Sequence, residues 1–158
     1  MEIRRVVIDD REEVSRFLEK HWGSTKMVTS VGAYDCSSLC GFILYDEHNN
    51  IIGLVTYEIR EKECEIISLD SLQENSGYGT ALMKAVEEKA KSVGCTKVTL
   101  ITTNDNVKAL RFYQRRGYHL AYLFPNAVQE ARKQKPSIPL VGYDEIPIRD
   151  ELLLMKKL

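Results

Sequence analysis

The sequence has little of several features that mark particular classes of protein. Its 22 basic and 23 acidic side chains leave a formal net charge of −1, so charge gives no reason to expect a nucleic acid as a partner. The four cysteines form no C-x-x-C pair and no spacing with histidine that suits a metal, which indicates reduced thiols and no metal site. The first twenty residues mix charged and apolar side chains. We therefore expect neither a signal peptide nor a membrane span, and a cytoplasmic protein with no membrane partner.

Length and composition indicate one globular domain. A chain of 158 residues with 44% hydrophobic and 28% charged residues is long enough to bury a sizeable core. The sequence has no repeats, low-complexity tracts or linker. We predict a single domain over residues 1–158.

A strand, a turn with two glycines and a helix follow one another in the middle of the chain. Residues 65–72 are rich in branched apolar side chains, and residues 80–93 carry apolar side chains at helical spacing before Gly94 ends the helix. A strand that turns into a helix presents unpaired backbone N–H groups at the positive end of the helix dipole, where a phosphate binds. The two glycines keep side chains out of the way of the anion. The residues expected to hold the phosphate are Gly77, Tyr78, Gly79 and Thr80.

Other phosphate-binding motifs do not fit this turn. A dinucleotide-binding fingerprint requires a third glycine where Leu82 stands. A P-loop requires Gly-Lys-Ser or Gly-Lys-Thr, whereas Thr80 and Ala81 follow Gly79. A tight strand-to-helix turn without a ligand is the remaining alternative.

A second strand and helix follow directly. Residues 97–103 are rich in β-branched side chains, and residues 104–106 can cap a helix that runs from about Val107 to Arg116 and ends at Gly117. Strand, helix, strand and helix in this order predict two parallel strands with a right-handed connection.

Two motifs follow one another at a characteristic separation, Gly77-x-Gly79-Thr80-x-Leu82 and Asn106-x-x-Ala109-x-x-Phe112-Tyr113-x-x-x-Gly117-Tyr118. Together they resemble the core signature of the GNAT superfamily of acetyl-CoA-dependent N-acetyltransferases. The resemblance covers about residues 1–124. It implies an α/β fold with a mixed, mostly antiparallel sheet and a central parallel strand pair flanked by helices. Glu74 departs from the family, which usually has Gln or Arg at that position, and we expect its side chain to point away from the anion.

The resemblance also implies a reaction, in which an acetyl group moves from acetyl-CoA to a primary amine without a metal. Tyr113 stands where relatives carry the general acid, and packing in the core is its alternative role. A strand glutamate often serves as the base, which makes Glu65 the first candidate and Glu63, alternatively a solvated turn residue, the second. Period-two spacing places both glutamates on one face of this strand and Asp70 on the other. Backbone amides near Leu69 or Ser71 are expected to polarise the thioester carbonyl.

Two further expectations concern binding and activity. Asn106 resembles the family asparagine that contacts the pantetheine arm, a role compatible with helix capping. His21 and Trp22 either line an acceptor pocket or fill the core beside a loop. Because the base is ambiguous, an acyl-CoA-binding sensor of the same fold that lacks turnover stays open as the second hypothesis. The residues do not rank the amine acceptors.

The remaining elements are predicted from alternation and turn residues. Strands are expected at residues 3–8, 41–45 and 51–60, with a helix that starts at Asp9 and Asp10 and a loop or short helix over 21–28. Residues 119–124 and 152–156 read as the last two strands, separated by an atypical insert at about 125–150. We expect the insert to be ordered and to wall the amine site, with a homodimer contact or a cover for the sheet edge as the alternative.

Overall fold

The structure, a computed structural model, describes residues 2–74 and 76–158 and forms two compact units. Unit 1 comprises the residues up to Met27, Asp35–Val98 and Leu158. Unit 2 comprises Val28–Tyr34 and Thr99–Lys157. The single-domain organisation stays a prediction.

Unit 1 is built on antiparallel strands in the order β1-β4-β5-β6. Its strands are β1 (Glu2–Arg5), β4 (Cys40–Tyr45), β5 (Ile51–Arg60) and β6 (Glu63–Ser71). Its helices are α1 (Arg11–Trp22), α2 (Tyr78–Ser92) and the short 3₁₀ helices η1 (Ile8–Asp10) and η2 (Cys36–Ser38). These elements follow the predicted order.

An extra residue in β6 shifts its register against β5. Ser68 pairs with Thr56 but Ile66 pairs with Tyr57, so Ile67 has no partner of its own. This is a β-bulge, which interrupts the alternation of side chains along the strand. The period-two expectation that Glu65 and Asp70 lie on opposite faces of β6 is therefore wrong.

The register defines which side chains share a face. Opposite Leu54, Thr56 and Glu58 of β5 lie Asp70, Ser68 and Glu65 of β6. Side chains two residues apart on β5 point to the same face, and directly paired residues share a face. The face of unit 1 that carries these six residues is called the Asp70 face below.

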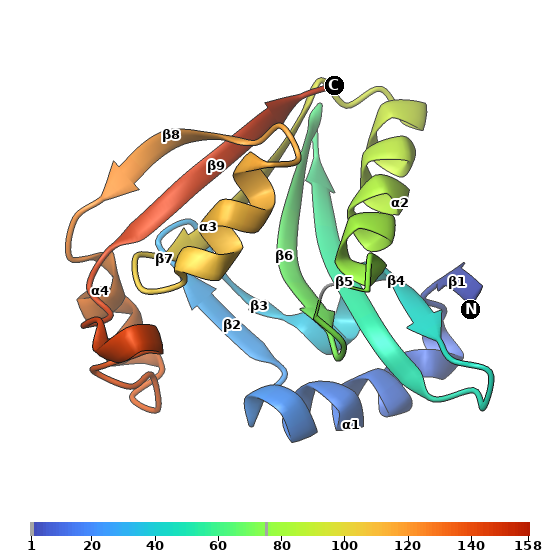
Figure 1. Ribbon diagram of the computed structural model, residues 1–158, viewed down its shortest axis with the longest axis horizontal. Coiled ribbons are helices and arrows are strands. Elements are labelled where there is room, and N and C mark those ends of the chain that lie inside the picture. The colour runs from blue at the N-terminus through green and yellow to red at the C-terminus, as the bar shows by residue number, and fades with distance from the viewer. Residues whose placement is uncertain (1, 75) are drawn as a thin grey trace. The chain divides into compact units, whose positions relative to one another are not determined.

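Helices α1 and α2 pack on opposite faces of these strands (Figure 1). A Cβ built on Gly53 would lie 2.9 Å from Leu82 Cδ1 of α2. Because side chains alternate along β5 and Leu54 lies on the Asp70 face, this Cβ would lie on the opposite face, which α2 covers. The last residue of α1, Trp22, instead donates a hydrogen bond to Asp70. Both helices bury the apolar stripes predicted from their spacing, which include Val14, Phe17 and Leu18 in α1 and Leu82, Met83, Val86 and Ala90 in α2.

The start of β7 (Lys97–Thr103) lies beside the start of β6. The Thr96 N–H donates to the Lys62 carbonyl at 2.8 Å, and the Lys97 ammonium lies 2.9 Å from the Glu63 carboxylate. Two strands that begin side by side are parallel, so the predicted parallel pair in a mostly antiparallel sheet is confirmed.

Unit 2 contains strands in the order β7-β9-β8. Its elements are α3 (Val107–Gln114), β8 (His119–Phe124), α4 (Ala127–Gln134), η3 (Tyr143–Glu145) and β9 (Glu151–Lys157). A hairpin of β2 (Lys26–Thr29) and β3 (Gly32–Asp35) falls mainly in this unit, so the prediction of a loop or short helix over 21–28 was wrong from Lys26 onward.

The insert before β9 is ordered, as predicted. The Arg132 guanidinium of α4 donates to the carbonyl oxygens of Ile138, Pro139 and Ile148, which ties the irregular segment to the helix. Ile148 is buried, whereas Leu140 is exposed. The insert therefore buries only some of its apolar side chains.

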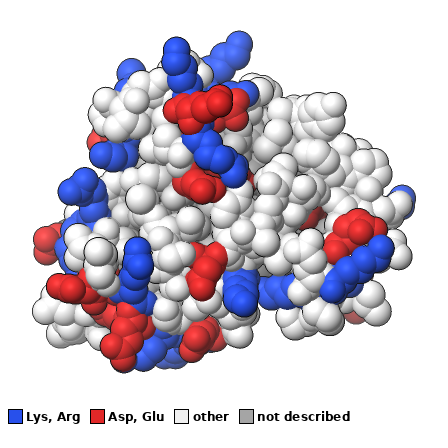
Figure 2. Space-filling model, turned by 180° about the vertical axis from the view of Figure 1, so that it is seen from behind, with Lys and Arg blue, Asp and Glu red and all other residues white. Residues whose placement is uncertain are grey.

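Basic and acidic side chains are interspersed on the face that Figure 2 shows. No helix among residues 2–74 and 76–158 is long and apolar enough to cross a membrane.

Candidate active site

The turn into α2 has the geometry predicted for an anion site. Gly77 is the N-cap of α2 and has φ of 84°, and the Ser76 hydroxyl oxygen accepts a long hydrogen bond of 3.4 Å from the Tyr78 N–H. The intrahelical ladder begins with the Ala81 N–H, which donates to the Gly77 carbonyl at 3.0 Å. The amides of Tyr78, Gly79 and Thr80 precede that ladder at the positive end of the helix dipole. Asn75, earlier in the same turn, lies outside the described residues.

The backbone at Gly77 is open. A Cβ built on this glycine meets no atom within 4 Å, so nothing crowds the backbone here. Glu74 is exposed, and the direction of its side chain relative to the anion stays a prediction. Tyr78, Gly79 and Thr80 are half-buried. The residues present can therefore hold the diphosphate of a coenzyme A molecule through backbone amides.

The end of β6 presents the two amides predicted to act on a carbonyl group. The Leu72 N–H donates to the Ile52 carbonyl at 2.9 Å, which makes this pair a hydrogen-bonded one. Such pairs alternate along an antiparallel ladder, so the amides of Leu69 and Ser71 point away from β5. Both amides are thus unused by the β5–β6 ladder.

The two glutamates predicted as the base both lie in ion pairs. The Arg60 guanidinium lies 2.5 Å from the carboxylate of buried Glu65 and 3.3 Å from that of Glu58, which faces Glu65 across the strands. Glu63 is exposed and pairs with Lys97. The roles of Glu65 and Glu63 stay predictions.

A third carboxylate, Asp70, was not among the predicted site residues. Its Oδ1 accepts a 2.6 Å hydrogen bond from Trp22 Nε1, and its buried Oδ2 has no hydrogen-bond partner among the residues that the structure describes. Burial raises the pKa of Asp70 to about 6, against the smaller lowering effect of the Trp22 hydrogen bond. One signal in the sequence pointed to this pair, because the indole N–H of the single tryptophan needs an acceptor when buried.

In unit 2, Tyr113 lies on α3, and Asn106 is the N-cap of that helix. The Tyr113 ring is half-buried and contacts the rings of Phe112 and Tyr118 edge-on, with centroids 5.2 Å and 6.0 Å away. The Asn106 Oδ1 accepts from the Ala109 N–H at 3.3 Å, which is the helix-capping role expected for it. The packing role of Tyr113 is thus present, and its catalytic role stays a prediction.

Comparison with known proteins identifies the family. The model described as "Acetyltransferase (GNAT) family" matches residues 9–118. The chain belongs to the GNAT acetyltransferases. It is 54% identical over 148 residues to the "Uncharacterized protein YxbD" of Bacillus subtilis (strain 168), covering 94% of this chain and 93% of that protein.

Solved structures share the GNAT fold. The IAA acetyltransferase from Bacillus cereus ATCC 14579 has a TM-score of 0.76 at 19% identity and covers 99% of both chains. A GNAT family acetyltransferase from Elizabethkingia anophelis with acetyl-CoA bound has a TM-score of 0.68 at 18% identity, covering 99% of this chain and 97% of that one. Both likenesses confirm the predicted fold class.

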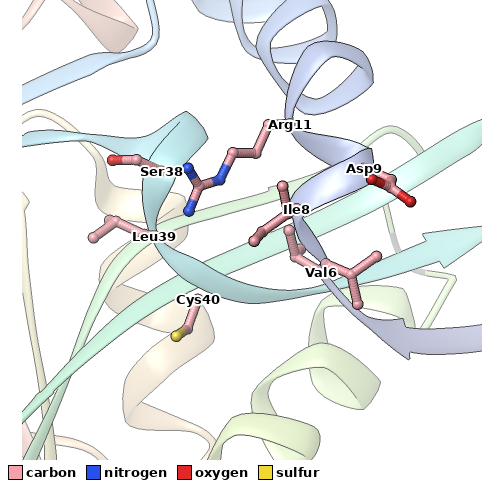
Figure 3. A pocket seen from close by; sticks show the side chains of 8 residues that line it. Val6, Ile8, Asp9, Arg11, Ser38, Leu39 and Cys40 are labelled. Atoms are coloured by element: carbon pink, nitrogen blue, oxygen red, sulfur yellow. The ribbon is translucent and has the colours of Figure 1, made fainter.

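Unit 1 of this GNAT protein also has an open hollow of about 490 Å³ (Figure 3). It is lined by Val6–Asp9, Arg11 and Ser38–Cys40, none of which is a predicted site residue. Ile8 and Cys40 on its wall are exposed. Within the described residues, no group of three or more His, Cys, Asp or Glu side chains is arranged to hold a metal ion.

Proposed function

We propose that this GNAT acetyltransferase moves an acetyl group from acetyl-CoA to the nitrogen of a primary amine. One observation carries the proposal: the start of α2 offers amides that precede the helical ladder, beside a Gly77 that leaves open space for an anion. Membership of the family supports the acyl donor. The acetyl-CoA thioester, when bound, supplies an activated acetyl group.

Each residue then has a proposed role in binding. The amides of Gly77, Tyr78, Gly79 and Thr80 hold the pyrophosphate, and the Thr80 hydroxyl is an additional donor. Asn106 contacts the pantetheine arm. The amides of Leu69 and Ser71 polarise the thioester carbonyl, and their orientation away from β5 supports this role.

The chemical roles follow from proton transfer. A protonated alkylamine has a pKa of ~10.4 and must lose a proton before it attacks, whereas the leaving thiol has a pKa of ~8.5 and takes a proton. Tyr113, with a phenol of comparable strength, gives that proton. A carboxylate on β6 takes the proton of the amine, with Glu65 as the first predicted candidate and Glu63 as the second.

Calorimetric titration with acetyl-CoA tests the binding site with a matched pair of variants. Gly77 and Gly94 stand at the two ends of α2, with φ of 84° and 87° and open space around a built Cβ in both cases. Gly77→Leu and Gly94→Leu therefore introduce similar backbone strain. We expect only Gly77→Leu to lose acetyl-CoA binding, and equal binding by both variants would contradict the phosphate site.

A thiol-release assay then tests the reaction with a small alkylamine, a polyamine, an aminoglycoside and peptides that present an N-terminal or lysyl amine. Turnover of any of them supports the proposal. Binding of acetyl-CoA without release of thiol with any amine would favour the acyl-CoA sensor instead.

A further inference from the structure

A carboxylate at the end of β6 differs from the paired ones in its surroundings. Glu65 forms an ion pair with Arg60, which also contacts Glu58, and Glu63 lies beside Lys97. Asp70 has one oxygen fixed by an indole N–H and a second oxygen that is buried without a hydrogen-bond partner among the described residues. A buried polar atom that lacks a partner costs free energy and calls for an explanation, of which a catalytic role is one.

The position of Asp70 along the chain supports that explanation. It stands between Leu69 and Ser71, whose amides point away from β5 and are proposed to hold the thioester carbonyl. Its side chain projects onto the Asp70 face, the side on which α1 ends at Trp22, whereas α2 covers the opposite side. Asp70 therefore places a carboxylate one residue away from the amides.

We propose that Asp70, held by Trp22, is the carboxylate that receives the ammonium group of the acceptor and removes its proton. The inference rests on the proposed acetyl transfer and narrows the acceptor to an amine that arrives as a cation. Trp22 is a positioning residue, since its indole N–H occupies Oδ1 and leaves Oδ2 for the ammonium.

The transfer balances with the groups already named. Asp70 takes one proton from the ammonium, and the neutral nitrogen attacks the thioester carbonyl carbon. The C–N bond forms as the C–S bond breaks, and the sulfur leaves with the electron pair. Tyr113 protonates the sulfur and regains a proton from the nitrogen through water. Asp70 returns its proton to solvent, so an ammonium and a thioester yield an amide, a thiol and one proton.

Several other polar or titratable groups lie near Asp70 or on the same face. Cys36 of η2 is buried, and burial raises the pKa of its thiol, so it stays neutral near pH 6. Thr56 and Ser68 hydrogen-bond to each other at 2.5 Å and carry no charge. Glu65, farther along the same face, lies beside Arg60. Glu58, opposite Glu65, contacts the same guanidinium.

The single tryptophan provides a readout that needs no acceptor. Trp22 fluorescence should titrate with a midpoint near pH 6 in the wild-type protein, because its indole donates directly to Asp70, whose pKa is raised to about 6. Asp70→Asn keeps an oxygen for the indole N–H and should abolish this titration. Glu47→Gln, which removes an exposed turn carboxylate, is the control and should keep it.

Kinetics with an acceptor found in the panel complete the test. We expect kcat/KM of the wild type to rise with pH through about 6, the value of the Asp70 pKa. Asp70→Asn should lose this limb together with ~10²–10⁴-fold of rate, the usual contribution of a general base. In Trp22→Phe the acid limb should move to higher pH, because the Trp22 hydrogen bond lowers the pKa of Asp70.

The outcomes separate this inference from the proposed function. An Asp70→Asn enzyme that keeps the acid limb and the wild-type rate would overturn the role of Asp70 alone, as would loss of the limb in Glu65→Gln with its retention in Asp70→Asn. If the wild type releases no thiol with any amine of the panel, the proposed transfer is overturned, and this inference with it.

Discussion

Replacing Asp70 by Asn should stabilise the protein at neutral pH. Burial raises the pKa of this carboxyl from its ordinary 3.8 to about 6, which means that the fold disfavours the charged form. Each pKa unit corresponds to about 1.4 kcal/mol, so the ionised carboxylate costs about 3 kcal/mol of folding free energy once both the folded and unfolded states are ionised. Asparagine has nearly the same shape, accepts the Trp22 hydrogen bond and carries no charge.

The sign of the effect follows from the two pKa values. Below about pH 4 the carboxyl is protonated in both states, and the wild type and Asp70→Asn should have similar stability. As the pH rises through about 6, the unfolded wild type is already ionised while the folded state resists ionisation, so the wild type loses stability that the variant keeps. The difference between the two should therefore grow to about 3 kcal/mol by pH 7.5.

Urea unfolding at pH 4, 5, 6 and 7.5 measures this difference, with Asp10→Asn as the control of opposite sign. Asp10 is also buried, but the hydrogen bonds from the Arg4 guanidinium lower its pKa. Its contribution to stability is present at neutral pH and lost as the pH falls through its folded pKa, so Asp10→Asn should destabilise most at pH 7.5. If Asp70→Asn is less stable than the wild type at pH 7.5, the Asp70 carboxylate has a stabilising partner and the reasoning is refuted.

Two other predictions concern unit 2. Tyr113→Phe should keep the edge contacts with Phe112 and Tyr118 and bind acetyl-CoA normally while turnover falls by ~10²–10⁴-fold, and an unchanged rate would leave Tyr113 a packing residue. Replacing residues 126–148 by a short turn should leave acetyl-CoA binding intact and abolish acceptor turnover, whereas persistent turnover with an unchanged acceptor KM would show that the insert is not part of the site.

The sequence predicted the elements whose periodicity and stop signals agree. The strand at 97–103 has the predicted bounds, and α2 ends beside Gly94, whose φ of 87° is the left-handed conformation that the stop required. The β2–β3 hairpin was missed because its strands have four residues each, too few for alternation to separate a strand from a loop. The first strand was predicted too long for a related reason, since Val7 and Ile8 continue its apolar run although η1 begins at Ile8.

The candidate base shows where prediction from sequence ends. Period-two spacing assigns Asp70 and Glu65 to opposite faces of one strand, because it counts every residue between them. The structure inserts Ile67 as an unpaired residue, and this one-residue step turns Asp70 onto the face of Glu65 and Ser68. Nothing in the letters around Ile67 marks a bulge, because its side chain is apolar and buried like that of any residue in a regular strand.

That single step has a chemical consequence for the proposed site. With a regular β6 that kept the pairing of Glu65 with Glu58, Asp70 would point to the face that α2 covers, and Trp22 of α1 would have no carboxylate to bind. With the bulge, the strand presents one paired carboxylate, Glu65, and one unpaired oxygen, on Asp70, along the same face. A paired carboxylate is held in its charged form, whereas a buried one without a partner retains affinity for a proton near neutral pH. The proton chemistry proposed here therefore depends on the backbone of β6 as much as on the residue type at position 70, and a variant that restores regular pairing at Ile67 should separate Trp22 from Asp70.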